Sequence, residues 1–184
     1  RRIAMLKRQY PNLDCQNIRG NLQTRLSKLE SGEYDAILLA AAGVHRLNWH
    51  DKITEYLDPF DTFIPAPGQG LLAIEFRADD EATRALLAPL LLTETTAAFT
   101  AERHVLKRLE AGCHTPLGVY AHITQPHSWE HHMALHLMLL SPDGSEWIKK
   151  EQRTAFSTHN LTENVTAAAE TLVKQVLESG MLVS

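Results

Sequence analysis

Long apolar runs are missing from this sequence, and cysteine is scarce. The two longest runs, Ala36–Gly43 and Leu86–Leu92, are far shorter than the roughly 20 residues that a membrane-spanning helix needs. We therefore expect no role within a membrane. The sequence has only two cysteines, Cys15 and Cys113, in contexts that do not resemble a disulfide framework. Such scarcity favours a protein of the reducing cytoplasm.

An initiator methionine and a signal peptide are missing as well. The chain opens on Arg1 and Arg2 in an amphipathic stretch, and no small-residue cleavage site follows. We therefore expect the chain to be a fragment of a longer protein. Its hydrophobic share of 44% and charged share of 22% are those of an ordinary globular protein.

Acidic residues are rare in residues 1–28, which carry seven Lys and Arg side chains against Asp14 alone, a local charge of +6. The rest of the chain is acidic, because the total net charge is -4 at pH 7. A basic segment in an acidic protein indicates an anionic ligand, although a solvated helix face would give the same pattern. Nucleic acid is not the expected ligand, because no aromatic platform is interleaved with these charges.

Up to about residue 92 the pattern alternates between strands and helices. It predicts helices over residues 1–9, 22–30 and 79–90, and strands over residues 13–18, 36–40 and 72–77. This alternation predicts a mainly parallel α/β layer. Ligands of such sheets bind beyond the carboxyl ends of the strands, and we expect Arg19, Arg25 and Arg46 to converge there.

The last third of the chain has a different pattern. A helix over residues 94–109 is followed by strands over residues 117–123, 132–140 and 146–154, with a hairpin turn at 141–144. A final helix begins at Asn160, which has capping-box spacing to Glu163. The pattern therefore predicts a small α+β domain with a three-stranded antiparallel sheet.

We divide the chain into three parts on this basis. Residues 1–62 form a partial α/β domain, and residues 63–92 form a crossover strand and helix that return to a first lobe. Residues 93–184 form the C-terminal α+β domain. The segment Pro65–Gly70, rich in Pro and Gly, marks the crossover.

Several motifs together resemble the porphobilinogen deaminase (hydroxymethylbilane synthase) family in order and spacing. They are Ile18-Arg19-Gly20-Asn21, Thr24-Arg25-Leu26, Tyr34 to Ala40 with Ala42-Gly43, Gly68-Gln69-Gly70, Ala101-Glu102-Arg103, and Leu109 to Cys113. The resemblance covers essentially the whole chain and is strongest up to about Pro116. It implies that the α/β part belongs to a two-lobed fold like that of the periplasmic binding proteins.

The resemblance also implies a reaction and a cofactor. The family joins four porphobilinogen molecules into hydroxymethylbilane, with release of ammonia, in haem and other tetrapyrrole biosynthesis. Its dipyrromethane cofactor would be linked by a thioether to Cys113. The family protein is expected to be a cytoplasmic monomer. No motif here matches the family's catalytic Asp, so we expect this fragment alone to be inactive.

Family roles carry over to several residues of this chain. The resemblance makes Arg19, Arg25 and Arg46 catalytic residues, and it assigns cofactor binding to Cys113, Arg1, Arg2, Arg19, Arg25, Ala40, Arg46, Gln69 and Gly70. The chemistry agrees, because each pyrrole bears an acetate and a propionate, and arginine binds a carboxylate through two parallel hydrogen bonds.

Cys113 follows the predicted helix 94–109, at the negative end of its dipole. This position does not favour a thiolate that must re-form in every cycle, and it suits a thiol alkylated once and kept as an anchor. The alternative is a buried structural thiol. The sequence departs from the family pattern at Ala111 and at Pro67, and neither departure removes a functional group.

Two other readings remain. The chain could be a non-catalytic anion-binding module, which would have no use for Cys113. A zinc site is suggested by His127, His131, His132 and His136, but alternation in residues 132–140 predicts a strand and not a helix with histidines on one face. Cys15, within a predicted strand, is expected to pack and not to react.

Overall fold

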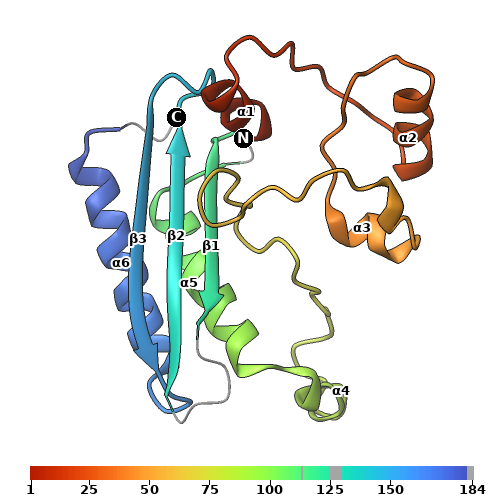
Figure 1. Ribbon diagram of the computed structural model, residues 1–184. Helices are drawn as coiled ribbons and strands as arrows, with labels where there is room; N and C mark the ends of the chain where they lie inside the picture. The colour runs from red at the N-terminus through yellow and green to blue at the C-terminus, as the bar shows by residue number, and fades with distance from the viewer. Residues whose placement is uncertain (113, 125–129, 182–184) are drawn as a thin grey trace. The chain divides into compact units, whose positions relative to one another are not determined.

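The computed structural model describes residues 1–112, 114–124 and 130–181 (Figure 1). These residues form two compact units. One consists of Arg1–Pro11 with Asp58–Ser184 and is called the sheet unit below; the other, Asn12–Leu57, is called the 12–57 unit. Among the described helices, none combines the length and apolar character that crossing a membrane would require.

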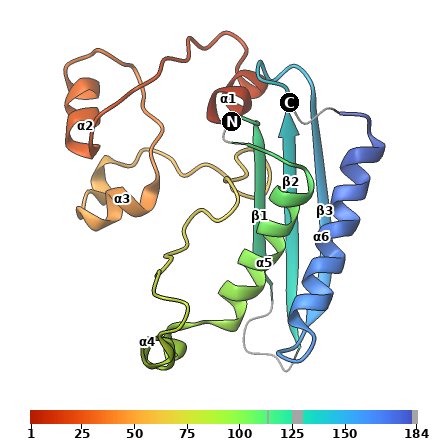
Figure 2. The same ribbon diagram turned by 180° about the vertical axis from the view of Figure 1, so that it is seen from behind.

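The sheet unit contains a three-stranded antiparallel sheet in the order β1-β2-β3. The strands are β1 (Leu117–Ile123), β2 (His131–Leu140) and β3 (Trp147–Phe156), each within two residues of its predicted bounds. Two long helices, α5 (Thr93–Arg108) and α6 (Leu161–Glu178), lie over one face of the sheet (Figure 2). The predicted α+β architecture of this part is confirmed.

The core of the sheet unit lies between the sheet and these two helices. Alternate residues of a strand point to the same face, so Val119, Leu135 and Leu137 all face the helices, where Val105 and Leu172 meet them. All five side chains are fully buried. Burying each such side chain contributes about 1.5–3 kcal/mol, which makes this layer the main source of stability in the unit.

The opposite face of the sheet is covered at Gly118 by Met5 of helix α1 (Arg2–Gln9) and by Ile64. Gly118 permits this close packing, because a Cβ there would lie 2.5 Å from the Ile64 carbonyl oxygen. The backbone N–H of Val119 donates to the Pro65 carbonyl at 2.9 Å. Residues 63–65 therefore lie along the free edge of β1.

Two predictions about the helices need correction. The predicted helix 79–90 is split into α4 (Glu81–Leu87) and a 3-10 turn η2 (Ala88–Leu90), because Pro89 cannot donate a helical hydrogen bond. Asn160 precedes α6 as predicted, but its side chain accepts from the Ser157 N–H at 2.6 Å and makes no bond to the helix. The expected capping box does not form.

The 12–57 unit is built from short helices. These are α2 (Leu22–Glu30), α3 (Ala41–Arg46) and the 3-10 turn η1 (His50–Lys52). Helix α2 has its predicted bounds, and the Asn21 side chain caps it by accepting from the Thr24 N–H at 2.8 Å. Gly43 packs closely on the Leu22 side chain, which joins α3 to α2.

The parallel α/β layer predicted for the first half of the chain is not present. Residues 13–18, 36–40 and 72–77 are not strands, and the only sheet among the described residues is β1-β2-β3. A strand is stabilised by hydrogen bonds to a neighbouring strand, and an apolar run does not specify that neighbour. The division into residues 1–62, 63–92 and 93–184 stays a prediction.

Candidate functional site

The predicted site residues fall into three groups. Arg19, Arg25, Ala40 and Arg46 belong to the 12–57 unit, whereas Arg1, Arg2, Gln69 and Gly70 belong to the sheet unit. Cys113 lies outside the described residues. Each group is therefore described within its own unit.

Arg19 and Arg25 flank the turn that begins helix α2. Gly20 has φ of +116° in this turn. Its carbonyl accepts a hydrogen bond of 2.8 Å from Nε of Arg25. That bond does not use the edge formed by Nη1 and Nη2, through which an arginine can bind a carboxylate. Arg19 is exposed and Arg25 half-buried, so this turn carries two arginines, one before Gly20 in the sequence and one after it.

Helix α3 carries the third arginine of the 12–57 unit. Ala40 precedes the helix in an extended conformation, and Arg46 is its last residue and is exposed. Next to Arg46, the ring of His45 stacks on His50 with 4.6 Å between centroids, and His45 Nε2 lies 2.7 Å from the Tyr56 hydroxyl. The convergence of the three arginines in one cavity stays a prediction.

Arg1 binds backbone in this structure. Its Nη1 donates to the Ile64 carbonyl at 3.0 Å, which ties the start of α1 to the segment beside β1. Burial, together with the neighbouring charge of Arg2, lowers the pKa of Arg1 to about 10. The guanidinium stays protonated at neutral pH and has its own structural partner.

Gln69 and Gly70 lie at the exposed end of the turn Pro65–Gly70. Gly68 and Gly70 have φ of +73° and +86°, a left-handed conformation that glycine adopts most easily. The Gln69 N–H donates to the Ala66 carbonyl at 3.1 Å. The turn is thus closed on itself, with the Gln69 side chain available to a ligand.

Glu102 is a residue of this region to which the sequence analysis gave no individual role. It lies on α5 and is buried, yet both of its carboxylate oxygens have partners. Oε2 accepts from the Gly68 N–H at 2.6 Å, and Oε1 accepts from the Ala121 N–H at 2.8 Å. Burial raises the pKa of this carboxyl, and the two N–H donors act in the opposite direction. A Glu between Ala98 and Val105 on an apolar helix stripe was the available signal.

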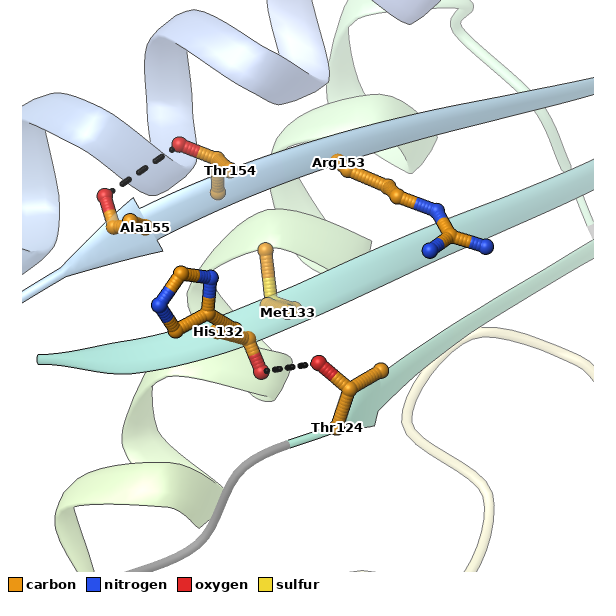
Figure 3. Close-up of a pocket in the computed structure, with 6 residues that line it drawn as sticks. All are labelled: Thr124, His132, Met133, Arg153, Thr154 and Ala155. Atoms are coloured by element: carbon orange, nitrogen blue, oxygen red, sulfur yellow. Dashed lines mark hydrogen bonds between the residues drawn. The ribbon is translucent and has the colours of Figure 1, made fainter. Parts of the chain in front are cut away.

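The pocket drawn in Figure 3 lies elsewhere on the sheet unit. It has a volume of about 360 Å³ and is lined by Thr124, His132, Met133, Arg153, Thr154 and Ala155. The Thr124 hydroxyl donates to the His132 carbonyl at 3.2 Å, and Arg153 Nε donates to Glu151 at 2.7 Å. Of the predicted site residues that the structure describes, none lines this pocket.

The histidines considered for zinc have other neighbours. The His131 ring stacks on Phe156 and lies 3.6 Å from the Glu94 carboxylate, whereas His136 packs against the ring of Phe60. His127 lies outside the described residues. Within the described ranges, no three His, Cys, Asp or Glu side chains are grouped closely enough to hold a metal ion.

Comparison with known proteins assigns both halves of the chain to one family. Residues 1–85 match the family model "Porphobilinogen deaminase, dipyromethane cofactor binding domain", and residues 96–179 match "Porphobilinogen deaminase, C-terminal domain". A porphobilinogen deaminase of Syntrophobacter fumaroxidans is 46% identical over 146 residues, which are 79% of this chain and 45% of that protein. The chain thus spans less than half the length of this relative. It belongs to the porphobilinogen deaminase family.

Proposed function

We propose that this chain is part of a hydroxymethylbilane synthase, a transferase of tetrapyrrole biosynthesis. It would join four porphobilinogen molecules into hydroxymethylbilane and release ammonia. The observation that carries the proposal is the match of both family models in their proper order along one chain. The positions of the arginines in the 12–57 unit support it.

We propose a dipyrromethane cofactor, thioether-linked to Cys113. When bound, this group would supply the free pyrrole carbon to which the first substrate unit is joined, and each later unit would be joined to the last ring of the growing chain. The residues present fit such a ligand, because its carboxylates require paired N–H donors. Arg25 is held by the Gly20 carbonyl through Nε, and Arg19, which directly precedes the same glycine in the sequence, is exposed.

In this proposal the protein binds and orients the reacting rings. Arg19, Arg25 and Arg46 would bind acetate and propionate groups and place each ring, and charge-assisted bonds of this kind contribute about 1.5–3 kcal/mol each. Arg1, Arg2 and Ala40 are further residues that we propose bind the cofactor. Gln69 and Gly70, at the exposed end of their turn, would contact the ligand from the sheet unit.

We also propose that residues 1–62 form part of the second lobe of a two-lobed fold and that residues 63–92 cross to the first lobe. Alternate apolar side chains in the segment 72–77 support this. Leu72, Ile74 and Phe76 are exposed here, the first by 85%. A segment with apolar side chains on one face is typical of a strand whose apolar face is buried once its neighbours are present.

The test of the proposed function is the intact mass of the protein as its gene encodes it. We expect a covalent addition of one dipyrromethane and a red colour with an acidic aldehyde reagent. Cys113→Ala should fold and lose both signals. The matched control Cys15→Ala, which removes the half-buried thiol of the 12–57 unit, should keep them.

Two outcomes would contradict the proposal. An adduct that persists in Cys113→Ala would place the attachment elsewhere. A wild-type protein with no adduct and no conversion of porphobilinogen would favour the non-catalytic anion-binding module.

A further inference from the structure

The carboxylate of Glu102 bridges two backbone segments at the edge of the sheet. Its side chain rises from α5 and is 5% exposed. It accepts one hydrogen bond from Gly68, in the turn Pro65–Gly70, and one from Ala121, in β1. Because each oxygen has its own donor, the buried carboxylate is satisfied on both sides.

This bridge extends the hydrogen bonding along the free edge of β1. Alternate residues of a strand direct their N–H groups to the same edge, so Val119 and Ala121 both donate away from β2. Val119 donates to the Pro65 carbonyl at 2.9 Å, and Ala121 donates to Glu102. The carboxylate therefore takes the place of the next carbonyl of a neighbouring strand.

The same bridge fixes the start of the exposed turn. Pro65 is held by β1, and Gly68 is held by Glu102 through the shorter of its two bonds. Gln69 and Gly70 follow directly and are exposed. A residue that only joined α5 to the sheet would have no need for the bond to Gly68.

We propose that Glu102 is a positioning residue, which holds the turn Pro65–Gly70 against β1 so that Gln69 is presented to the ligand in one fixed place. This inference rests on the proposed function, because it takes Gln69 to contact the cofactor or substrate. It adds a residue that acts through backbone and touches no ligand.

The first arm of the test needs no activity. Amide hydrogen exchange is measured by NMR on the 184-residue chain, for wild type, Glu102→Gln and the control Glu94→Gln on the same helix. A glutamine side chain has one oxygen and cannot accept from both donors. We expect the exchange rate of the Gly68 amide to rise about tenfold or more in Glu102→Gln and not in Glu94→Gln. The order of exchange rates among the β2 amides should stay the same in both variants.

The second arm measures turnover in the protein as its gene encodes it, for Glu102→Gln, Gln69→Ala and the double variant. We expect Glu102→Gln to retain the covalent adduct, lose turnover, and add little further loss once Gln69 is absent. Glu102→Asp keeps both carboxylate oxygens on a shorter side chain. Its turnover should lie between that of Glu102→Gln and that of wild type.

The outcomes separate three claims: the Glu102 bridge, its action through Gln69 and the proposed function. Wild-type exchange at Gly68 in Glu102→Gln would overturn the bridge. Fully additive losses in the double variant would overturn the action through Gln69 while leaving the proposed function intact. A wild-type protein without adduct or turnover would overturn the proposed function and the positioning role with it, whereas the bridge itself would still be judged by the exchange data.

Discussion

At the scale of single residues, the protein uses arginine in two different ways. Arg1 is committed to the backbone of Ile64, and burial lowers its pKa to about 10. Arg25 donates to the Gly20 carbonyl through Nε. This bond orients the guanidinium and leaves Nη1 and Nη2 available to a ligand. The family resemblance predicted both as ligand-binding groups, and it gave no indication that their backbone partners differ.

Arg25→Leu should therefore affect the ligand more than the fold. We expect loss of cofactor assembly or chain elongation, with unfolding free energy changed by less than about 1 kcal/mol, because the bond to Gly20 lies at the surface. The control is Arg84→Leu, which removes an exposed arginine that also donates to backbone, at Ala78. Substrate conversion and urea unfolding check both variants. Equal conversion by Arg25→Leu and wild type would contradict the assigned role.

Elements formed by local patterns were predicted well, and those that need distant partners were not. Alternating residues such as Val119 and Leu135 specify one buried face, and β1, β2 and β3 lie within two residues of their predicted bounds. The apolar run at residues 36–40 has no such internal signal, because its structure depends on strands that would lie beside it. The role of Glu102 was missed for the same reason, since its two donors come from distant segments.

The packing of the segment 63–65 on β1 gives a prediction about stability. Gly118→Ala would place a methyl group 2.5 Å from the Ile64 carbonyl oxygen and 3.0 Å from Met5. Backbone cannot yield easily, so we expect a loss of about 1–3 kcal/mol in unfolding free energy. Urea unfolding measures it. Gly112→Ala is the control, because a Cβ there meets no atom within 4 Å; equal losses in the two variants would contradict this account.

At the scale of the whole molecule, exposed apolar segments such as residues 72–77 indicate which parts need further segments of the same protein to pack against. If residues 72–77 become a strand only beside other chain segments, their amides should exchange rapidly in the 184-residue chain. The same amides should be protected in the protein as its gene encodes it, whereas β2 should be protected in both. Hydrogen exchange with mass spectrometry makes the comparison. Equal protection of residues 72–77 in the two proteins would argue against the two-lobed proposal.

The sheet unit combines residues that precede the 12–57 unit in the sequence with residues that follow it. Helix α1 contacts the hairpin between β2 and β3: a Cβ on Gly144 would lie 2.3 Å from the Ala4 carbonyl oxygen, and the Arg8 guanidinium lies 3.8 Å from the centre of the Trp147 ring. Helix α1 therefore packs against residues that are synthesised about 140 residues later. During synthesis α1 cannot complete its packing until that hairpin emerges, so the sheet unit closes late.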